Sequence, residues 1–121
     1  MTEVDLLADA DARARAYVAG ADARRAYPDA EALAALVGFD EALPDVGAPP
    51  EQTLEMLDRL GSPATVASNG PRYFGFVKGA SLPVAAAAER LVLAWDQSAA
   101  SAMGAPSAAA IERVAARWIT E

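Results

Sequence analysis

Alanine supplies much of the apolar content of this chain, and this limits the core that the chain can build. Apolar residues make up 54% of the 121 residues, but an alanine side chain removes far less surface from water on burial than a leucine or a phenylalanine does. Large apolar residues are sparse and spread along the sequence. The composition therefore predicts helices that pack closely against something else, rather than a tight independent core.

The composition also disfavours several classes of function. The chain has no cysteine and no histidine, which argues against a disulfide framework, a zinc site and the usual general base. The net charge is −7, and residues 1–60 hold thirteen acidic against five basic residues. Because an acidic first half repels phosphate backbones, we predict no nucleic-acid partner.

Neither a signal peptide nor a membrane span is predicted. The segment Met1–Asp5 is acidic where a signal peptide requires basic residues followed by an apolar run. Glu89 and Arg90 interrupt the longest apolar stretch, which is therefore too short to cross a bilayer. We expect a cytoplasmic protein without a membrane partner.

The spacing of apolar residues, with proline and glycine as boundary signals, predicts a mostly helical chain. Thr2 is the expected cap of the first helix, with Asp5 completing a capping box. Residues 39–50 have the composition of an irregular connector, and Arg72–Val77 that of a short extended segment. The helix predicted over residues 50–60 is expected to end at Gly61–Pro63. The predicted helices cover residues 3–25, 30–37, 50–60, 83–98 and 106–121.

Few side chains are candidates for catalysis. Lys78 is the only lysine, and a lysine desolvated in a pocket can act as a Schiff-base nucleophile. A solvated lysine in a loop fits the same sequence. Gly79 and Ser81 do not have the spacing of a phosphate-binding motif. The aromatic residues are expected to serve mainly as packing anchors in an alanine-rich chain.

Several motifs in the second half occur in the order and spacing of a known family. They are Pro71–Phe76, Ser81–Pro83, Glu89 with Leu91, Trp95–Gln97, Ala105-Pro106, and the Ile111, Val114 and Trp118 stripe. Together they resemble the N-terminal part of the pyridoxal-phosphate-dependent amino-acid decarboxylases, which include aromatic-amino-acid and glutamate decarboxylases. The resemblance covers residues 50–121 well and the earlier helices more loosely.

The resemblance implies a homodimer of the aspartate-aminotransferase-like superfamily, in which an N-terminal helical segment lies across the partner subunit. It implies that Phe76, Val77 and Lys78 sit beside the substrate pocket, and that Gln97 and Ser98 approach the subunit interface. Lys78 departs from the small polar residue or proline common there. In the family, the residues that hold pyridoxal phosphate come later in the chain than this segment, so the resemblance implies no cofactor for this chain alone.

Two hypotheses of different classes follow. In the first, residues 1–49 form N-terminal helices with a connector, and residues 50–121 form a truncated decarboxylase-like segment lacking the α/β cofactor domain. Such a segment would supply dimer contacts and a wall of the amino-acid pocket without being catalytic alone, and its partner would be a second copy or the missing C-terminal domain. In the second, the chain is a stand-alone α-helical protein-interaction module.

Overall fold

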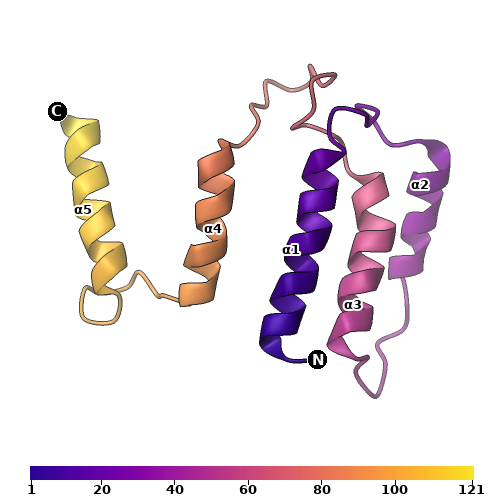
Figure 1. The fold of residues 1–121 in the computed structure, drawn as a ribbon, viewed down its shortest axis with the longest axis horizontal. Helices are drawn as coiled ribbons and strands as arrows, with labels where there is room; N and C mark the ends of the chain where they lie inside the picture. The colour runs from indigo at the N-terminus through magenta and orange to yellow at the C-terminus, as the bar shows by residue number, and fades with distance from the viewer. The chain divides into compact units, whose positions relative to one another are not determined.

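The computed structural model describes all 121 residues, which form five α-helices joined by shorter helical turns and loops, without a strand. The prediction of a mostly helical chain is confirmed. The chain divides into two compact units, Met1–Ala80 and Ser81–Glu121, and each is described by itself. The helices in Figure 1 are α1 (Glu3–Ala19), α2 (Ala30–Ala35), α3 (Pro50–Met56), α4 (Pro83–Trp95) and α5 (Pro106–Thr120).

Side-chain caps fix where α1 and α2 begin. Thr2 Oγ1 accepts a hydrogen bond from the Asp5 amide at 3.2 Å, and the Asp5 carboxylate accepts one from the Thr2 amide at 2.8 Å. This is the predicted capping box, which satisfies two amides that the first helical turn leaves without a partner. Asp29 caps α2 in the same way by accepting from the Ala32 amide at 2.9 Å.

α1 ends at Ala19, earlier than the predicted residue 25. Gly20 follows, and residues 20–24 continue as turns with three-residue hydrogen bonds, from the Ala21 amide to the Val18 carbonyl and from the Ala23 amide to the Gly20 carbonyl. Glycine is a poor helix former because folding restricts its backbone more than that of any other residue. The turn brings Arg24 back toward the end of the third helical segment.

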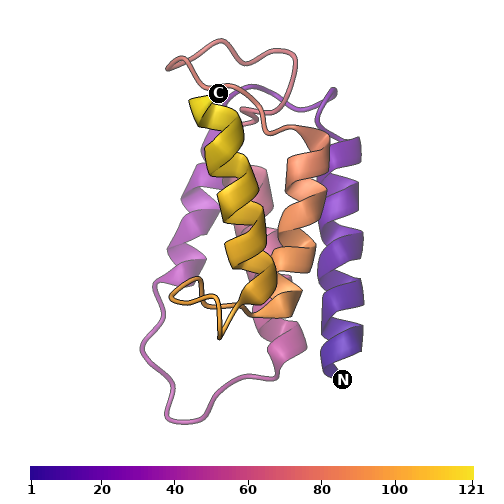
Figure 2. The ribbon, with the colours of Figure 1, turned by 90° about the vertical axis from the view of Figure 1, so that its left-hand side faces the viewer.

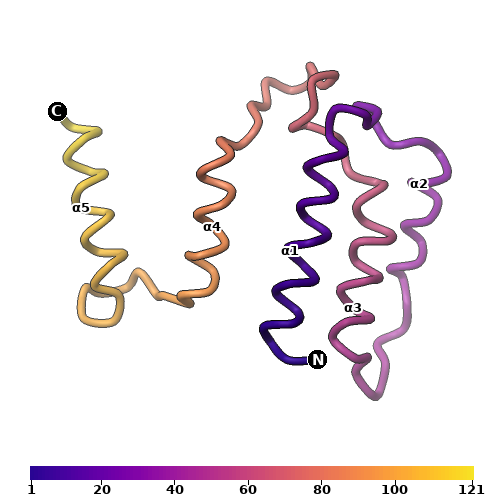
Figure 3. Tube along the Cα trace, in the orientation of Figure 1, coloured from indigo at the N-terminus to yellow at the C-terminus, as the bar shows by residue number.

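The third helical segment is longer than the sequence predicts. α3 passes into a π-helical turn, η2 (Leu57–Gly61), and then into a 3₁₀ turn, η3 (Ser62–Ala64). The helical turns therefore run four residues past the predicted end at residue 60, and they stop one residue after the expected stop signal Gly61–Pro63. Pro63 lacks the amide that a regular α-helix would need there, and the change of helix type accommodates it. We call α3, η2 and η3 together, residues 50–64, the rod. Figure 3 follows it as a continuous trace from the connector after α2 to the loop after Ala64.

In the first unit the rod lies between α1 and α2 (Figure 1), with α1 against α3, and α2 against η3. A 3₁₀ turn after α2, η1 (Leu36–Phe39), packs on η2. Leu60 is the only large side chain that is buried, at 7% exposed. It packs so closely on η1 that a Cβ added at Gly38 would come within 2.9 Å of Leu60 Cδ1. Ala21 and Ala67 are the other buried residues of this unit.

The second unit has almost no core of its own. α4 and α5 run in opposite directions (Figure 2), and both begin with proline at the first turn, as predicted. Only Ala105, in the turn between them, is buried. Every residue of α4 is exposed, although the predicted inward face includes Leu91 and Trp95. A helix that is apolar nearly all round is normally buried, and nothing within the second unit covers the apolar surface of α4.

Candidate functional site

The segment expected to be extended, Arg72–Val77, forms no strand. It is a series of turns in which Phe76 and Val77 both have a φ of 54°. Alternating aromatic residues favour an extended conformation only when a neighbouring strand satisfies the backbone, and no strand is present. The left-handed conformation is uncommon outside glycine, and for a β-branched residue such as Val77 it is strained.

One end of this loop is fixed to the first unit. Arg72 Nη1 donates a hydrogen bond to the Arg24 carbonyl at 3.1 Å, and the Ala67 amide donates to the Ala26 carbonyl at 3.1 Å. The Tyr73 side chain folds over Gly75, where an added Cβ would lie 2.9 Å from the tyrosine oxygen. The base of the loop is therefore anchored within the first unit.

Beyond this base the loop presents apolar side chains to solvent. Phe74 and Phe76 are 93% and 90% exposed, and Val77 is fully exposed. Lys78 is also exposed, and its amide donates to the Gly75 carbonyl at 3.4 Å. The predicted pocket residues Phe76, Val77 and Lys78 thus form one continuous exposed surface on the strained turn. We call residues 74–78 the aromatic loop.

Lys78 does not fit the Schiff-base lysine of a pyridoxal-phosphate site. A Schiff-base lysine needs a pocket that excludes water, and Lys78 is exposed, with Val77 beside it fully exposed. No group of three or more acidic side chains is arranged to hold a metal ion. Lys78 therefore lies in water, without the enclosure that a Schiff-base nucleophile needs.

The predicted interface residues, Gln97 and Ser98, follow the end of α4 in the second unit. Asp96 ends α4 with a left-handed φ of 47°, and the Gln97 side chain donates to the Trp95 carbonyl at 2.7 Å. Both Gln97 and Ser98 are exposed. Gln97 therefore has a local function that the sequence did not reveal, because it satisfies a carbonyl at the end of α4.

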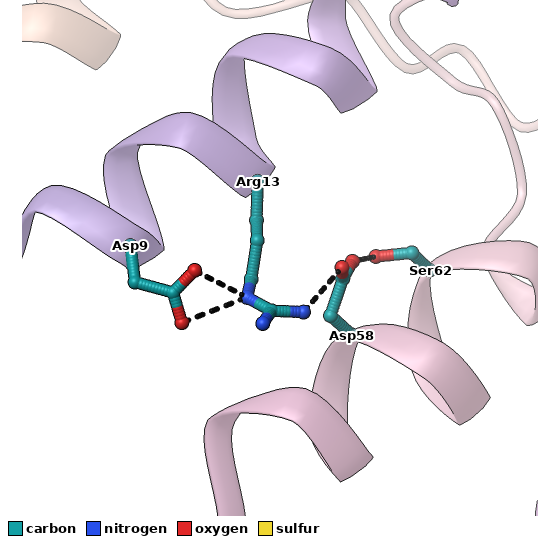
Figure 4. A network of polar contacts seen from close by, with 4 residues as sticks. All are labelled: Asp9, Arg13, Asp58 and Ser62. Carbon is teal, nitrogen blue, oxygen red and sulfur yellow. Dashed lines mark hydrogen bonds and ion pairs between the residues drawn. The ribbon is translucent and has the colours of Figure 1, made fainter. Parts of the chain in front are cut away.

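A second candidate cluster, which sequence reasoning missed, lies between α1 and the rod (Figure 4). Arg13 donates through Nε to both oxygens of Asp9 at 3.1 Å, and through Nη1 to Asp58 Oδ2 at 3.1 Å. Ser62 donates to the other oxygen of Asp58. The pair of Asp9 with Arg13 could be read from its four-residue spacing. The contact with Asp58 spans 45 positions, and no local pattern predicts it.

The charges of this cluster stabilise one another. The Ser62 hydroxyl and then the Arg13 guanidinium hold the pKa of Asp58 below its ordinary value of 3.8, against the opposing effect of desolvation. Hydrogen bonds from Arg13 to Asp9 and Asp58 raise the arginine pKa in return. Arg13 and Asp58 border an apolar hollow of about 310 Å³ that also includes Leu54 and Leu57. The cluster has a cation between two carboxylates, an arrangement that links α1 to the rod.

A third set of polar contacts closes the other end of the first unit. Arg24 lies over the Tyr17 ring at 4.1 Å from its centroid, within range of a cation–π interaction. It also donates to the Ser62 carbonyl, and to Thr65 Oγ1 at 3.0 Å. The Tyr17 hydroxyl lies 2.7 Å from Thr65 Oγ1. These contacts hold the last turn of the rod against the turn after α1.

No protein-family model, curated protein or solved structure matches the chain. The decarboxylase resemblance therefore stays a prediction based on the residues quoted above. The boundary predicted at residue 50 marks where the resemblance to that family begins. The boundary at residue 80 marks a different property, the division of the chain into two compact units.

The aromatic loop and the apolar surface of α4 are the features of this chain best suited to binding another protein. None of the helices combines the length and apolar character needed to cross a bilayer. Exposed aromatic residues and leucines are typical of the centres of protein interfaces. The polar clusters of the first unit, in contrast, make their hydrogen bonds within the unit.

Proposed function

We propose that the chain is the N-terminal dimerisation and substrate-pocket segment of a pyridoxal-phosphate-dependent amino-acid decarboxylase of the cytoplasm. The observation that carries the proposal is the exposure of α4, a helix with only two charged residues and no buried residue. Apolar surface on this scale is favourable only when a partner covers it. The sequence resemblance supplies the identity of that partner, which is the rest of the enzyme and its second subunit.

In this proposal the aromatic loop forms part of the wall of an amino-acid pocket. Phe76 and Val77 provide apolar contacts, and Lys78 brings a positive charge that suits a substrate carboxylate. The strain at Phe76 and Val77 supports this role, because left-handed conformations outside glycine concentrate at ligand sites. Gln97 and Ser98 approach the other subunit. The cofactor is held by the family's later residues, and the chemistry it supplies is removal of the substrate carboxylate.

A stand-alone interaction module is the alternative, and the polar clusters of the first unit favour it. Arg13 with Asp58, and Arg24 with Thr65, are contacts that hold residues 1–80 together without a partner. The gene distinguishes the two readings. A reading frame that continues past residue 121 into a glycine-rich, serine- and threonine-containing segment, or a neighbouring gene that encodes one, supports the decarboxylase proposal.

The direct test is to mix the chain with pyridoxal phosphate, reduce with borohydride and measure the intact mass. The proposal predicts no stoichiometric adduct at Lys78, because the loop offers no pocket to exclude water. Peptide mapping separates Lys78 from the α-amino group of Met1, which is also a reactive amine, and Lys78→Arg is the matched control. A stoichiometric adduct that maps to Lys78 and disappears in Lys78→Arg would overturn the proposal in favour of a small lysine-dependent enzyme.

A further inference from the structure

A second hollow of the first unit lies where the turn after α1 meets the last turn of the rod. Its volume is about 200 Å³, and its lining is more polar than that of the hollow between α1 and the rod. The charged residues that line it are Arg24, Arg25 and Asp29, while Tyr27 and Thr65 add hydroxyl groups. Sites for drug-sized molecules have volumes of about 300–1,000 Å³, so this hollow suits a smaller ligand.

A third arginine adds to the positive charge beside this hollow. Arg72 Nη1 donates to the Arg24 carbonyl at 3.1 Å, so the Arg72 guanidinium lies against the same turn of the chain. The Ala67 amide holds that turn at a second point, through its hydrogen bond of 3.1 Å to the Ala26 carbonyl. Three arginines are therefore gathered at a hollow with a single acidic lining residue, in a chain whose net charge is −7.

None of these three arginines forms an ion pair. Arg13 and Arg15, in contrast, each pair with the aspartate one turn before them on α1. Arg24 uses only Nη2 for its two hydrogen bonds, which leaves its Nε and Nη1 donors for a ligand. The Arg25 side chain is exposed and makes no hydrogen bond within the chain. An anion bound here would gain the attraction of these cations without displacing a carboxylate.

We propose that this hollow binds a small phosphate monoester, held by Arg24 and Arg25 with Arg72 beside them. Guanidinium groups match the geometry of phosphate oxygens through paired N–H donors. A monoester carries a charge of about −1.5 to −2 at neutral pH, so it gains more from three cations than a carboxylate or a phosphodiester does. The acidic remainder of the chain disfavours a long polyanion such as a nucleic acid. The inference is independent of the decarboxylase proposal, because it uses residues of the first unit alone.

Arg25 offers a variant that removes charge from the site without removing a contact of the fold. We expect glycerol 2-phosphate to shift the amide NMR signals of residues 24–29 to a saturating value in the original chain. Arg25→Gln should bind about tenfold more weakly, the effect of losing one hydrogen bond between charged groups. Arg113→Gln is the matched control, because Arg113 is an exposed arginine of α5 that does not line the hollow. It should bind as tightly as the original chain.

A second probe separates a monoester from other phosphates. Dimethyl phosphate has the same geometry with a single charge, and it should bind severalfold more weakly than glycerol 2-phosphate at the same ionic strength. Equal binding of the two compounds would indicate a phosphodiester site and would overturn the choice of ligand. Signals that do not saturate in the original chain, or an equal loss of affinity in Arg25→Gln and Arg113→Gln, would overturn the site itself.

Discussion

Arg13 on α1 and Asp58 on η2 form an ion pair of 3.1 Å across 45 positions of the chain, and each is also held by a neighbour on its own segment. Asp9 holds Arg13 from the preceding turn of α1, and Ser62 holds Asp58 from the following turn of the rod. The cluster therefore joins two helical segments, each of which orients its own member of the pair. In a unit whose only large buried side chain is Leu60, such a contact has a larger share of the stability than it would have beside a full core.

Asp58→Asn removes the charge of the pair and keeps the shape of the side chain. We expect it to lower the free energy of unfolding by about 0.5–1 kcal/mol, the range for a partly exposed ion pair with a hydrogen bond. Chemical denaturation followed by circular dichroism measures the change. Asp45→Asn, on an exposed acidic residue of the connector, is the matched control and should leave stability unchanged. Equal stability of the two variants would contradict a linking role for Asp58.

The same pair makes stability depend on pH. Because the folded-state pKa of Asp58 lies below its ordinary value of 3.8, the group stabilises the fold above that value, and the contribution is lost as pH falls through the folded-state pKa. In the original chain, the midpoint of unfolding should decrease as the pH is lowered from about 6 to about 3. The fall should be smaller in Asp58→Asn, although Asp5, whose pKa is also lowered by its hydrogen bonds to Thr2, retains its own contribution. Identical pH profiles would contradict the assignment.

Leu60→Ala tests whether the first unit depends on one side chain. Removing a buried leucine costs about 2–5 kcal/mol, which approaches the whole stability of a small domain. We expect a large loss of helical circular dichroism at room temperature. Leu57→Ala, three residues earlier and mostly exposed, should change little. Similar behaviour of the two variants would show that the unit does not close on Leu60.

Val77→Gly tests the strain in the aromatic loop. A left-handed β-branched residue is unfavourable by about 1–2 kcal/mol, and part of this is offset by the flexibility that glycine gives the unfolded chain. We expect the free chain to gain about 0.5–1 kcal/mol in stability. Val46→Gly, in the exposed connector and without a positive φ, should give no gain. A loss of stability in Val77→Gly as large as in Val46→Gly would mean that the turn is not strained.

The sequence predicts the helices of this chain well where their signals are local. Thr2, Asp29, Pro83 and Pro106 each mark a helix start within a residue, because a cap or a first-turn proline acts through its immediate neighbours. The sequence does not predict a helix end that depends on a contact with a residue far away in the chain. The rod continues to Ala64 where Arg24 donates to the Ser62 carbonyl from 38 positions away.

The aromatic loop and the cluster around Arg13 were also predictable only where their contacts are local. Aromatic alternation over Arg72–Val77 predicts an extended segment, but a strand needs a paired neighbour and this chain has none. Asp9 with Arg13 is predictable from spacing, whereas the third member of the cluster, Asp58, becomes a neighbour only when the rod packs on α1. The exposure of the loop residues and of α4 follows from the packing, which no local pattern encodes.

The molar mass of the free chain in solution tests the central claim most directly. A single chain weighs 12.5 kDa, and size-exclusion chromatography with light scattering distinguishes one copy from two. If the exposed surface of α4 and α5 serves dimerisation, the chain elutes with twice that mass and reverts to a single copy in Leu91→Glu. A monodisperse monomer of 12.5 kDa with a sharp, cooperative unfolding transition would contradict the account.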